Sequence, residues 1–341
     1  MDSATAQRLF NAYREGLLNR EGPNPKDYQP RFQVLLLHLT YTQFSLAERL
    51  YIRKARQTSA QALALAREGR LQEATECINY GRDHLTGVDR LSPARLMAES
   101  TLESANAYLD YRTGHYEQAR RRLLAAMDAD LVLEQNETFG LLEIHRIQSA
   151  LNLMRLELRS GQHEKAFLLA GRVLAYLENL DSSLPVHHSW RSEALIRVPR
   201  AVRRAMVTQV GNDTALALLK TKDPRSWPAF CAGLRLAAKH PWGPEKVLHQ
   251  AIQQWVCLKQ VFEQQDWDLY QVLLADFLPA GRRDVAAIWY ASVIDFLHFC
   301  KMAASRASQQ VYNGILRDSQ KWPALPPLLR ECIENTQLSA R

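Results

Sequence analysis

The chain has 341 residues, of which 47% are hydrophobic and 23% are charged, so it is long enough to bury a large core and is not expected to be disordered throughout. Its formal net charge of +7 is modest for this length, which argues against a protein that coats nucleic acid but permits acidic partners. Glycine and proline number only 14 each. Leu, Ala, Arg, Glu and Gln, which lose little rotamer freedom in a helix, are abundant, so the composition predicts an all-α chain.

The compartment is predicted from three features of the sequence. The start, MDSATAQRLFNAYREG, lacks the basic region, apolar run and small-residue cleavage site of a signal peptide. The apolar run FQVLLLHLTYTQF is interrupted by polar residues and is shorter than the about 20 residues that a membrane span needs. The five cysteines are scattered without a CxxC pair, which is typical of reduced thiols. We therefore expect a cytoplasmic protein without a membrane segment.

Two helical segments are predicted at the start of the chain. The sequence favours a helix over Ala4–Asn19 and a second helical run over Pro30–Phe44. The terminal units of a helical array cannot leave an apolar face exposed. We therefore expect residues 1–44 to form N-terminal capping helices.

Three pairs of helices are predicted over residues 45–180. The first helices of the pairs are Ser45–Arg67, Ser92–Arg112 and Thr138–Arg159, and the second helices are Arg70–Leu85, His115–Met127 and Gln162–Leu177. The sequence SLAE at the first start is a capping box. SPAR at the second start offers an N-cap serine followed by a proline at the first helical position.

The turns between the paired helices repeat. They are REGRLQEA (Arg67–Ala74), RTGHYEQA (Arg112–Ala119) and RSGQHEKA (Arg159–Ala166). Each has Arg two residues before Gly and Ala five residues after it, and Gly69, Gly114 and Gly161 are spaced by 45 and 47 residues. Glycine can adopt the left-handed conformation that reverses the chain, and Arg complements the negative end of the first helix. Ala lets the two helices approach closely.

The residues around these turns resemble those of the tetratricopeptide-repeat (TPR) family. The second copy follows the family's order of small, aromatic, glycine, aromatic and alanine positions with Ala107, Tyr111, Gly114, Tyr116, Ala119, Leu123 and Ala126. This resemblance implies an α-solenoid of antiparallel helix pairs, a TPR-like superhelix with helical caps. The chain departs from the family in its longer period, since the family repeats at about 34 residues. It also has DAD (Asp128–Asp130) where the family's terminal proline is expected.

The pattern weakens over residues 181–341, which we predict to be divergent helical repeats and a C-terminal cap. DSSLPVHH predicts a loop, and a helix is expected over Trp190–Val210. A fourth copy is indicated by DWDLYQVLLADFLPAGRRDVAAIWYASVIDFL, with Gly281 at its turn and Ala286 five residues later. In the long run that follows, Asp284–Asp318, only Gly314 offers a break.

The sequence carries no catalytic motif. HExxH, GxSxG and a glycine-rich phosphate loop are all absent from it. His187 and His188 are adjacent and have Asp181 and Glu193 nearby, but neighbouring side chains point in different directions, so a metal site there is disfavoured. We expect neither enzymatic activity nor a cofactor.

A concave groove is the binding site that the TPR resemblance implies. First helices line this groove in the family, which here places in it Leu63, Arg67, Ser104, Tyr108, Tyr111, Arg112, Leu151, Arg155 and Arg159. Such a surface suits a protein or peptide partner with acidic and apolar residues. The family's carboxylate clamp needs Lys and Asn where this chain has Ser59, Leu63 and Ala105, so that activity is unsupported. For the last-turn arginines, helix capping alone is the alternative role.

Two basic clusters offer a different kind of site. They are Arg120–Arg122 and a strip formed by Arg197, Arg200, Arg203 and Arg204. The strip could bind a phosphate or an acidic peptide, but a solvated helix face is the favoured interpretation. We therefore expect a cytoplasmic scaffold or adaptor with a regulatory role that binds a protein or peptide. The alternative is nucleic-acid or phosphate-ligand binding through residues 197–204, with an affinity that falls steeply with salt.

Overall fold

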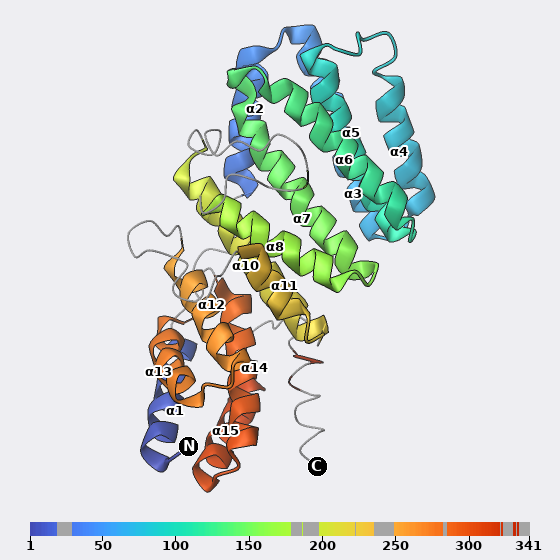
Figure 1. Cartoon of the computed structure of the whole chain (residues 1–341). Helices are drawn as coiled ribbons and strands as arrows, with labels where there is room; N and C mark the ends of the chain where they lie inside the picture. Colours follow the sequence, from blue (N-terminus) through green and yellow to red (C-terminus); the bar gives the residue numbers. More distant parts are fainter. Residues whose placement is uncertain are drawn as a thin grey trace. The chain divides into compact units, whose positions relative to one another are not determined.

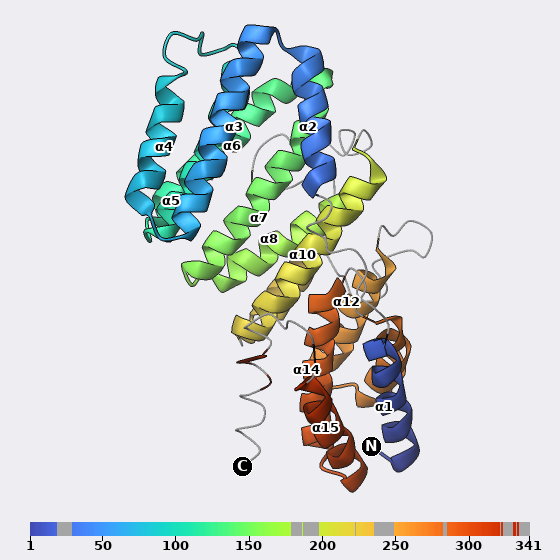
Figure 2. The ribbon, with the colours of Figure 1, turned by 180° about the vertical axis from the view of Figure 1, so that it is seen from behind.

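The computed structural model describes residues 1–18, 29–178, 186, 198–221, 223–234, 249–281, 285–320, 322, 330–331 and 333. In this part of the chain the regular secondary structure is helical and no β-strand occurs, as Figures 1 and 2 show from opposite sides. The prediction of an all-α chain is confirmed.

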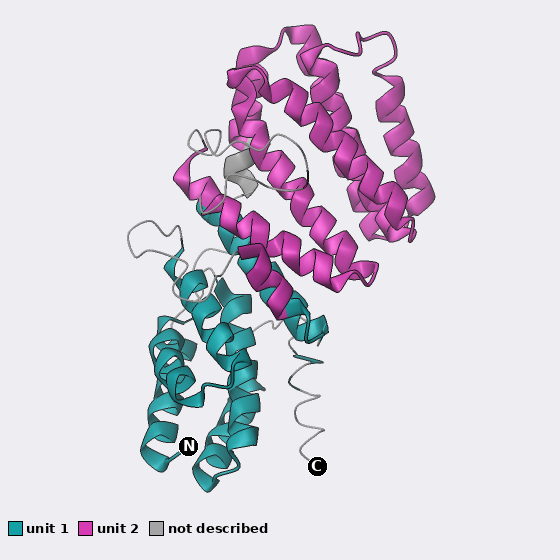
Figure 3. Ribbon diagram, viewed as in Figure 1, with its two compact units in different colours: residues 1–28, 204–226, 237–341 teal, residues 29–203, 227–236 magenta. Residues whose placement is uncertain are grey.

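The chain divides into two compact units, which are coloured in Figure 3. Unit 1 comprises residues 1–28, 204–226 and 237–341, and unit 2 comprises residues 29–203 and 227–236. The helix α10 (Arg200–Thr221) begins in unit 2 and continues into unit 1. This division differs from the expected one at residues 44 and 180, because the N-terminal helix belongs with the C-terminal helices.

Unit 2 contains the three predicted helix pairs. They are α3 (Leu46–Arg67) with α4 (Leu71–Asp83), α5 (Pro93–Arg112) with α6 (Tyr116–Glu134), and α7 (Glu143–Arg159) with α8 (His163–Leu177). The helix α2 (Gln29–Gln43) precedes them, the 3-10 helix η2 (Glu137–Leu142) leads into α7, and α11 (Ser226–Leu234) packs on α8. Neighbouring pairs pack through α3 on α5 and through α6 on α7.

The three predicted glycine turns have the same backbone conformation. The φ angles of Gly69, Gly114 and Gly161 are 86°, 82° and 78°, in the left-handed region. In the first turn the Arg70 N–H donates to the Leu65 carbonyl over 2.9 Å, which is the bond that closes a Schellman motif. An added Cβ would meet no atom within 4 Å at any of the three glycines. Glycine is therefore required there by the backbone conformation and not by crowding.

The alanines that follow the turns lie in the contact between paired helices. Ala74, Ala119 and Ala166 are each 0% exposed. Around the first two pairs the core continues this pattern, with a cluster of alanines and leucines from α3, α4 and α5. Small side chains at these positions let the helix backbones approach closely, as the sequence predicts.

The starts of the first helices follow the predicted capping signals in two cases out of three. The Ser45 N–H donates to Glu48 over 2.8 Å while the Glu48 N–H donates to the Ser45 hydroxyl over 3.4 Å, so the capping box is present. Ser92 caps α5 by accepting from the Arg95 N–H over 3.3 Å. The third start differs, because Thr138 lies in η2 and α7 begins five residues later, at Glu143.

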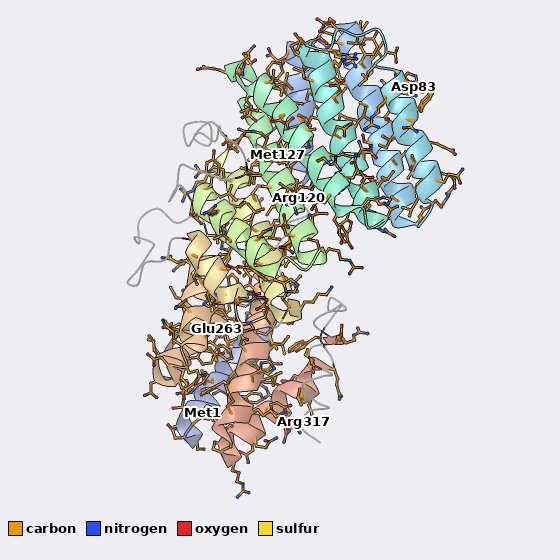
Figure 4. The ribbon with its side chains drawn as sticks, turned by 45° about the vertical axis from the view of Figure 1, so that its right-hand side comes forward. Met1, Asp83, Arg120, Met127, Glu263 and Arg317 are labelled. Carbon is orange, nitrogen blue, oxygen red and sulfur yellow. The ribbon has the colours of Figure 1, made fainter. Side chains whose placement is uncertain are left out.

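The arginines of α6 connect neighbouring helices. Arg122 donates to Asp110 over 2.5 Å and to Glu103 over 3.0 Å, both on α5. Arg120, labelled in Figure 4, pairs with Glu157 of α7. Two of the three arginines in the predicted Arg120–Arg122 cluster therefore serve as links between helices, and only Arg121 is exposed.

Unit 1 is built from the first helix and the C-terminal helices. Its elements are α1 (Ser3–Leu18), α12 (Gln250–Glu263), α13 (Trp267–Phe277), the 3-10 helix η3 (Leu278–Ala280), α14 (Ala286–Ala303) and α15 (Arg306–Ser319), with part of α10. The helix α1 packs against α13, η3 and α15. The last two helices are separated at Ala304, which has a left-handed φ of 45°, and not at Gly314, which lies inside α15.

The first helix contributes to the core of unit 1. The Tyr13 ring stacks on Trp289 with 5.9 Å between centroids, and its hydroxyl accepts from the Trp322 indole N–H over 3.2 Å. At Gly16 an added Cβ would lie 2.0 Å from the Leu278 carbonyl oxygen, so glycine allows the close approach. The expected role of α1 as a cap on the helix pairs is therefore replaced by a role in the interior of unit 1.

The sequence predicts a fourth helix pair with its turn at Gly281, but the pair in the structure begins one helix earlier in the chain. It is α12 with α13, and its turn residue is Gln265, whose φ is 58°. The Asp266 N–H donates to the Val261 carbonyl over 3.2 Å, the same bond as in the glycine turns. Gly281, the predicted turn residue, follows η3; its φ of 73° is positive, but its ψ of −169° differs from that of a left-handed helical turn. The fourth turn therefore has the Schellman hydrogen bond without glycine.

Candidate functional site

Unit 2 contains a groove with a volume of about 1070 Å³. Side chains from α2, α3, α5, α6 and α7 line it. The helix α3 contributes along most of its length, from Leu46 to Arg67. At 1.5 Å per residue this is a wall of about 30 Å.

One end of the groove is apolar and open to solvent. Leu37 and Tyr41 of α2 are 43% and 60% exposed, and Leu46 and Leu50 of α3 are 73% and 55% exposed. All four line the groove. Large apolar side chains gathered on a surface mark an interaction site when they are contiguous, since exposed single residues are ordinary but patches are not.

The charged side chains that line the groove are basic. They are Arg49, Arg53, Arg56, Arg67 and Arg155, and no Asp or Glu is among the lining residues that the structure describes. Arg49 is committed to the fold, because it donates to the carbonyls of Phe44 and Tyr41 over 2.7 Å and 2.5 Å. Arg53 and Arg67 are exposed and have no ion-pair partner in the described part of the chain. The groove therefore has a positive potential.

The helix α5 contributes two tyrosines to the lining of the groove, together with a buried hydroxyl. The rings of Tyr108 and Tyr111 stack with centroids 6.0 Å apart. Arg112 lies over the Tyr108 ring and donates to its hydroxyl over 3.3 Å. Among the described residues the Ser104 hydroxyl oxygen is buried without a hydrogen-bond partner. The two tyrosines offer a bound molecule aromatic contact.

A histidine connects the groove to the interior of unit 2. His145 lines the groove, and its Nδ1 lies 2.6 Å from the buried Asp130 carboxylate and 3.2 Å from the Ser100 hydroxyl. Burial alone would lower the pKa of His145. The attraction of the Asp130 carboxylate and its hydrogen bond to the imidazole act in the opposite direction, and the net shift of the pKa is upward. When His145 is protonated, its charge is balanced by the Asp130 carboxylate, so the pair adds no net charge to the groove.

Behind His145 is a buried polar network. Arg146 donates to both oxygens of Glu134 over 2.7 Å and 2.5 Å, and these side chains are 2% and 8% exposed. Glu143 is fully buried and accepts from the Tyr176 hydroxyl. Burial raises the pKa of Glu134 and of Glu143 to about 7. This network supports the wall of the groove but does not open into it.

Six of the nine predicted groove residues line this groove. They are Leu63, Arg67, Ser104, Tyr108, Tyr111 and Arg155. Leu151 is 0% exposed and lies in the core, because α7 is buried on more than one face. Arg112 and Arg159 are exposed in the last turns of their helices, outside the lining.

The sequence does not predict the apolar end of the groove. The sequence pattern places Leu37 and Tyr41 in the cap, and Leu46 and Leu50 at the start of the first pair. A signal for them exists in α3, where Leu46, Leu50, Arg53 and Gln57 follow one another at helical spacings of three and four residues. A stripe of this kind that is not buried by another helix indicates a binding face.

The predicted basic strip does not form a single surface. Arg203 is partly buried and donates to the Leu177 carbonyl at the end of α8 over 2.7 Å, and burial lowers its pKa. Arg200 and Arg204 are exposed on α10. Arg197 lies outside the described residues, as do His187 and His188 with Asp181 and Glu193.

The remaining candidate chemistry gives no further site. Within the ranges that the structure describes, no group of three or more His, Cys, Asp or Glu side chains is placed to hold a metal ion. Over the same ranges no helix combines the length and the apolar character needed to cross a membrane. Comparisons with protein-family models, with curated proteins and with solved structures find no match to the chain.

Proposed function

We propose that the chain is a binding protein, a scaffold or adaptor that holds a protein or peptide partner in the groove of unit 2. The observation that carries this proposal is the joint presence of exposed apolar side chains at one end and of Arg53 and Arg67, which have no ion-pair partner in the described part of the chain, along the lining. An adaptor needs no catalytic group or cofactor. The scattered cysteines suit a cytoplasmic location, where thiols stay reduced.

The class proposed for unit 2 is a TPR-like α-solenoid with long helices. Three consecutive helix pairs with Schellman turns and an alanine at each close contact support it. Stacked pairs of this kind contact their neighbours in sequence and leave an extended surface between first helices. The α3, α5 and α7 side chains that line the groove suit such a surface.

The proposed mechanism of binding is docking onto a preformed surface. The groove is formed by regular helices, of which α3 and α5 have side-chain caps, and the paired helices are joined by Schellman turns, so its backbone needs little ordering when a partner binds. Burial of Leu46, Leu50 and their neighbours would supply affinity. The arginines would select the partner's charge and orientation and raise its association rate.

Affinity capture from a native lysate tests this proposal. The groove variant is Leu46→Asp with Leu50→Asp, and the matched control is Leu91→Asp, because Leu91 is 79% exposed in the same unit but does not line the groove. We expect a set of captured proteins that the wild type and the Leu91→Asp variant share and that the groove variant loses. Identical sets from all three chains, measured by quantitative mass spectrometry, would contradict the proposal.

The second candidate function is nucleic-acid or phosphate-ligand binding by α10. The exposure of Arg200 and Arg204 favours it, whereas the bond from Arg203 to Leu177 weakens the strip. Replacing Arg200 and Arg204 by Ala distinguishes the two functions. Capture that persists in the Leu46→Asp, Leu50→Asp variant but falls in the α10 variant, with a steep dependence on salt, would favour α10.

A further inference from the structure

The charged side chains that line the groove indicate the chemistry of the molecule that binds in it. This inference rests on the function proposed above. Five arginines and His145 line the groove, and no carboxylate is present among the lining side chains described. Elsewhere in unit 2 several arginines pair with carboxylates, as Arg122 does with Asp110 and Glu103. The groove arginines Arg53 and Arg67 lack such partners within the described ranges, so an acidic occupant would complete the charge pairing.

The side chains along α3 make the two ends of the groove chemically different. Leu46 and Leu50 occupy its first turns, and Arg53 and Arg67, the lining arginines of α3 without an ion-pair partner in the described part of the chain, lie beyond them. Arg49, between the two leucines, is bonded to the carbonyls of Phe44 and Tyr41. At 1.5 Å per residue the apolar part covers about 6 Å of α3 and the stretch from Arg53 to Arg67 about 21 Å. The apolar end is extended by Leu37 and Tyr41 of α2. An occupant would therefore need apolar residues at one end and carboxylates spread over several turns beyond them.

Three hydroxyl groups of the groove lining are already engaged within the fold. The hydroxyl groups of Thr40 and Thr101 donate to backbone carbonyls of their own helices over 2.8 Å and 3.0 Å, and that of Ser59 donates to the Thr101 carbonyl over 3.4 Å. An extended backbone would bring N–H and C=O groups that need new partners in the groove. A helix satisfies its own backbone and presents only side chains.

We infer that the groove binds an acidic amphipathic α-helix of about 20 residues, whose apolar end contacts Leu46 and Leu50 and whose carboxylates pair with Arg53 and Arg67. The length follows from the wall of about 30 Å that α3 provides. On such a helix, apolar anchors spaced at i, i+3, i+4 and i+7 would lie on one face.

Selection from a display library of random peptides of about 20 residues tests the inference with the full chain as bait. Peptides that also bind the Leu46→Asp, Leu50→Asp variant are removed, so that only groove-dependent binders remain. We expect these to carry net negative charge, to show apolar residues at helical spacing, and to gain helical circular dichroism on binding. Groove-dependent peptides that are basic, or that bind in an extended conformation, would overturn the inference while leaving the proposed function intact. Failure to recover any groove-dependent peptide would count against the proposed function itself.

Charge reversal provides the second measurement. The charge-reversed groove variant carries both Arg53→Glu and Arg67→Glu. The control variant carries both Arg90→Glu and Arg121→Glu, which change the net charge equally at exposed arginines of unit 2 outside the groove lining. We expect the groove pair to weaken the selected peptides by tenfold or more and the control pair by less than threefold, in fluorescence anisotropy. Replacing the peptide's Glu residues by Lys should restore binding to the reversed groove. Equal losses in both variants, with thermal melting unchanged, would overturn the assignment of Arg53 and Arg67.

Discussion

The helix pairs of unit 2 and the pair α12–α13 of unit 1 make the same turn with different residues. In unit 2 the left-handed position is always glycine, at Gly69, Gly114 and Gly161. In unit 1 it is Gln265, and the hydrogen bond that closes the turn is kept. A side chain in the left-handed region costs about 1–2 kcal/mol, which glycine avoids. The turn geometry is therefore common to both units, while its sequence signature is confined to unit 2.

The residues after the turn differ in the same way. Five residues beyond the left-handed position unit 2 has a buried alanine, whereas unit 1 has Tyr270, which is also 0% exposed. Tyr270 packs edge-on against Trp267 and Phe299 at 6.2 Å and 5.4 Å between centroids. The α12–α13 pair thus joins an aromatic core, while the unit 2 pairs have small side chains at their close contacts. Large interlocking rings fix one arrangement of helices, whereas small residues at regular intervals can be repeated along an array.

The largest expected effect comes from the buried ion pair of unit 2. Arg146→Met removes the cation and leaves the Glu134 carboxylate in the interior, which should reduce the free energy of unfolding by about 3–5 kcal/mol. The measurement is urea denaturation followed by far-ultraviolet circular dichroism. In the double variant Arg146→Met, Glu134→Leu both charges are absent, so it should recover most of the loss. A single variant as stable as the wild type would show that the pair is not part of the unit 2 core.

The next largest expected effect is a dependence of the free energy of unfolding on pH, which is caused by Glu143. The pKa of this carboxyl is raised in the folded chain to about 7 by burial, so between about 4.5 and 7 the folded state binds more protons than the unfolded state. The stability that protonated Glu143 contributes is complete below about pH 4.5 and is lost as the pH rises to about 7 and above. We expect the wild type to lose up to about 3 kcal/mol relative to Glu143→Gln between pH 4.5 and pH 8. Parallel stability curves for the two chains, from urea denaturation at each pH, would show that Glu143 titrates normally.

The three turns and their alanines can be predicted from the sequence because they depend on local chemistry. Glycine at a left-handed position and serine at an N-cap leave a signature within a few residues. Gly69, Ala74 and Ser45 all lie where the local pattern places them.

The features that escape prediction depend on contacts distant in sequence. The packing of α1 beside α14 is encoded by Tyr13 and Trp289, which are far apart in the chain. The α12–α13 turn escapes because Gln265 carries no signal for the left-handed conformation. The apolar end of the groove escapes because an amphipathic face looks the same in sequence whether it is buried or open, as the exposed Leu46 shows.

A smaller effect is expected at the glycine turns. Gly161→Ala should reduce the free energy of unfolding of unit 2 by about 1 kcal/mol, because the left-handed φ of 78° is unfavourable for alanine while space for the methyl group is available. Gly161→Asn should cost less, since Asn tolerates this conformation. Urea denaturation of the two variants beside the wild type gives the comparison. An alanine variant that equals the wild type would mean that the turn can relax, and that glycine is not what distinguishes the unit 2 pairs.

The smallest effect has the opposite sign and lies in unit 1. Gln265→Gly removes the left-handed strain but adds backbone freedom to the unfolded chain, so a net gain of about 0.5–1 kcal/mol is expected. The neighbouring Gln264 has a right-handed φ of −79°, and Gln264→Gly should instead destabilise by a similar amount. Tryptophan fluorescence during urea denaturation monitors unit 1 through Trp267, which begins α13. If Gln265→Gly stabilises the chain and Gln264→Gly does not, unit 1 has the same turn as unit 2 and lacks only the glycine. Equal responses at both positions would mean instead that the aromatic core around Tyr270 holds the α12–α13 turn whatever residue occupies it, and that the likeness between the two units ends at the backbone.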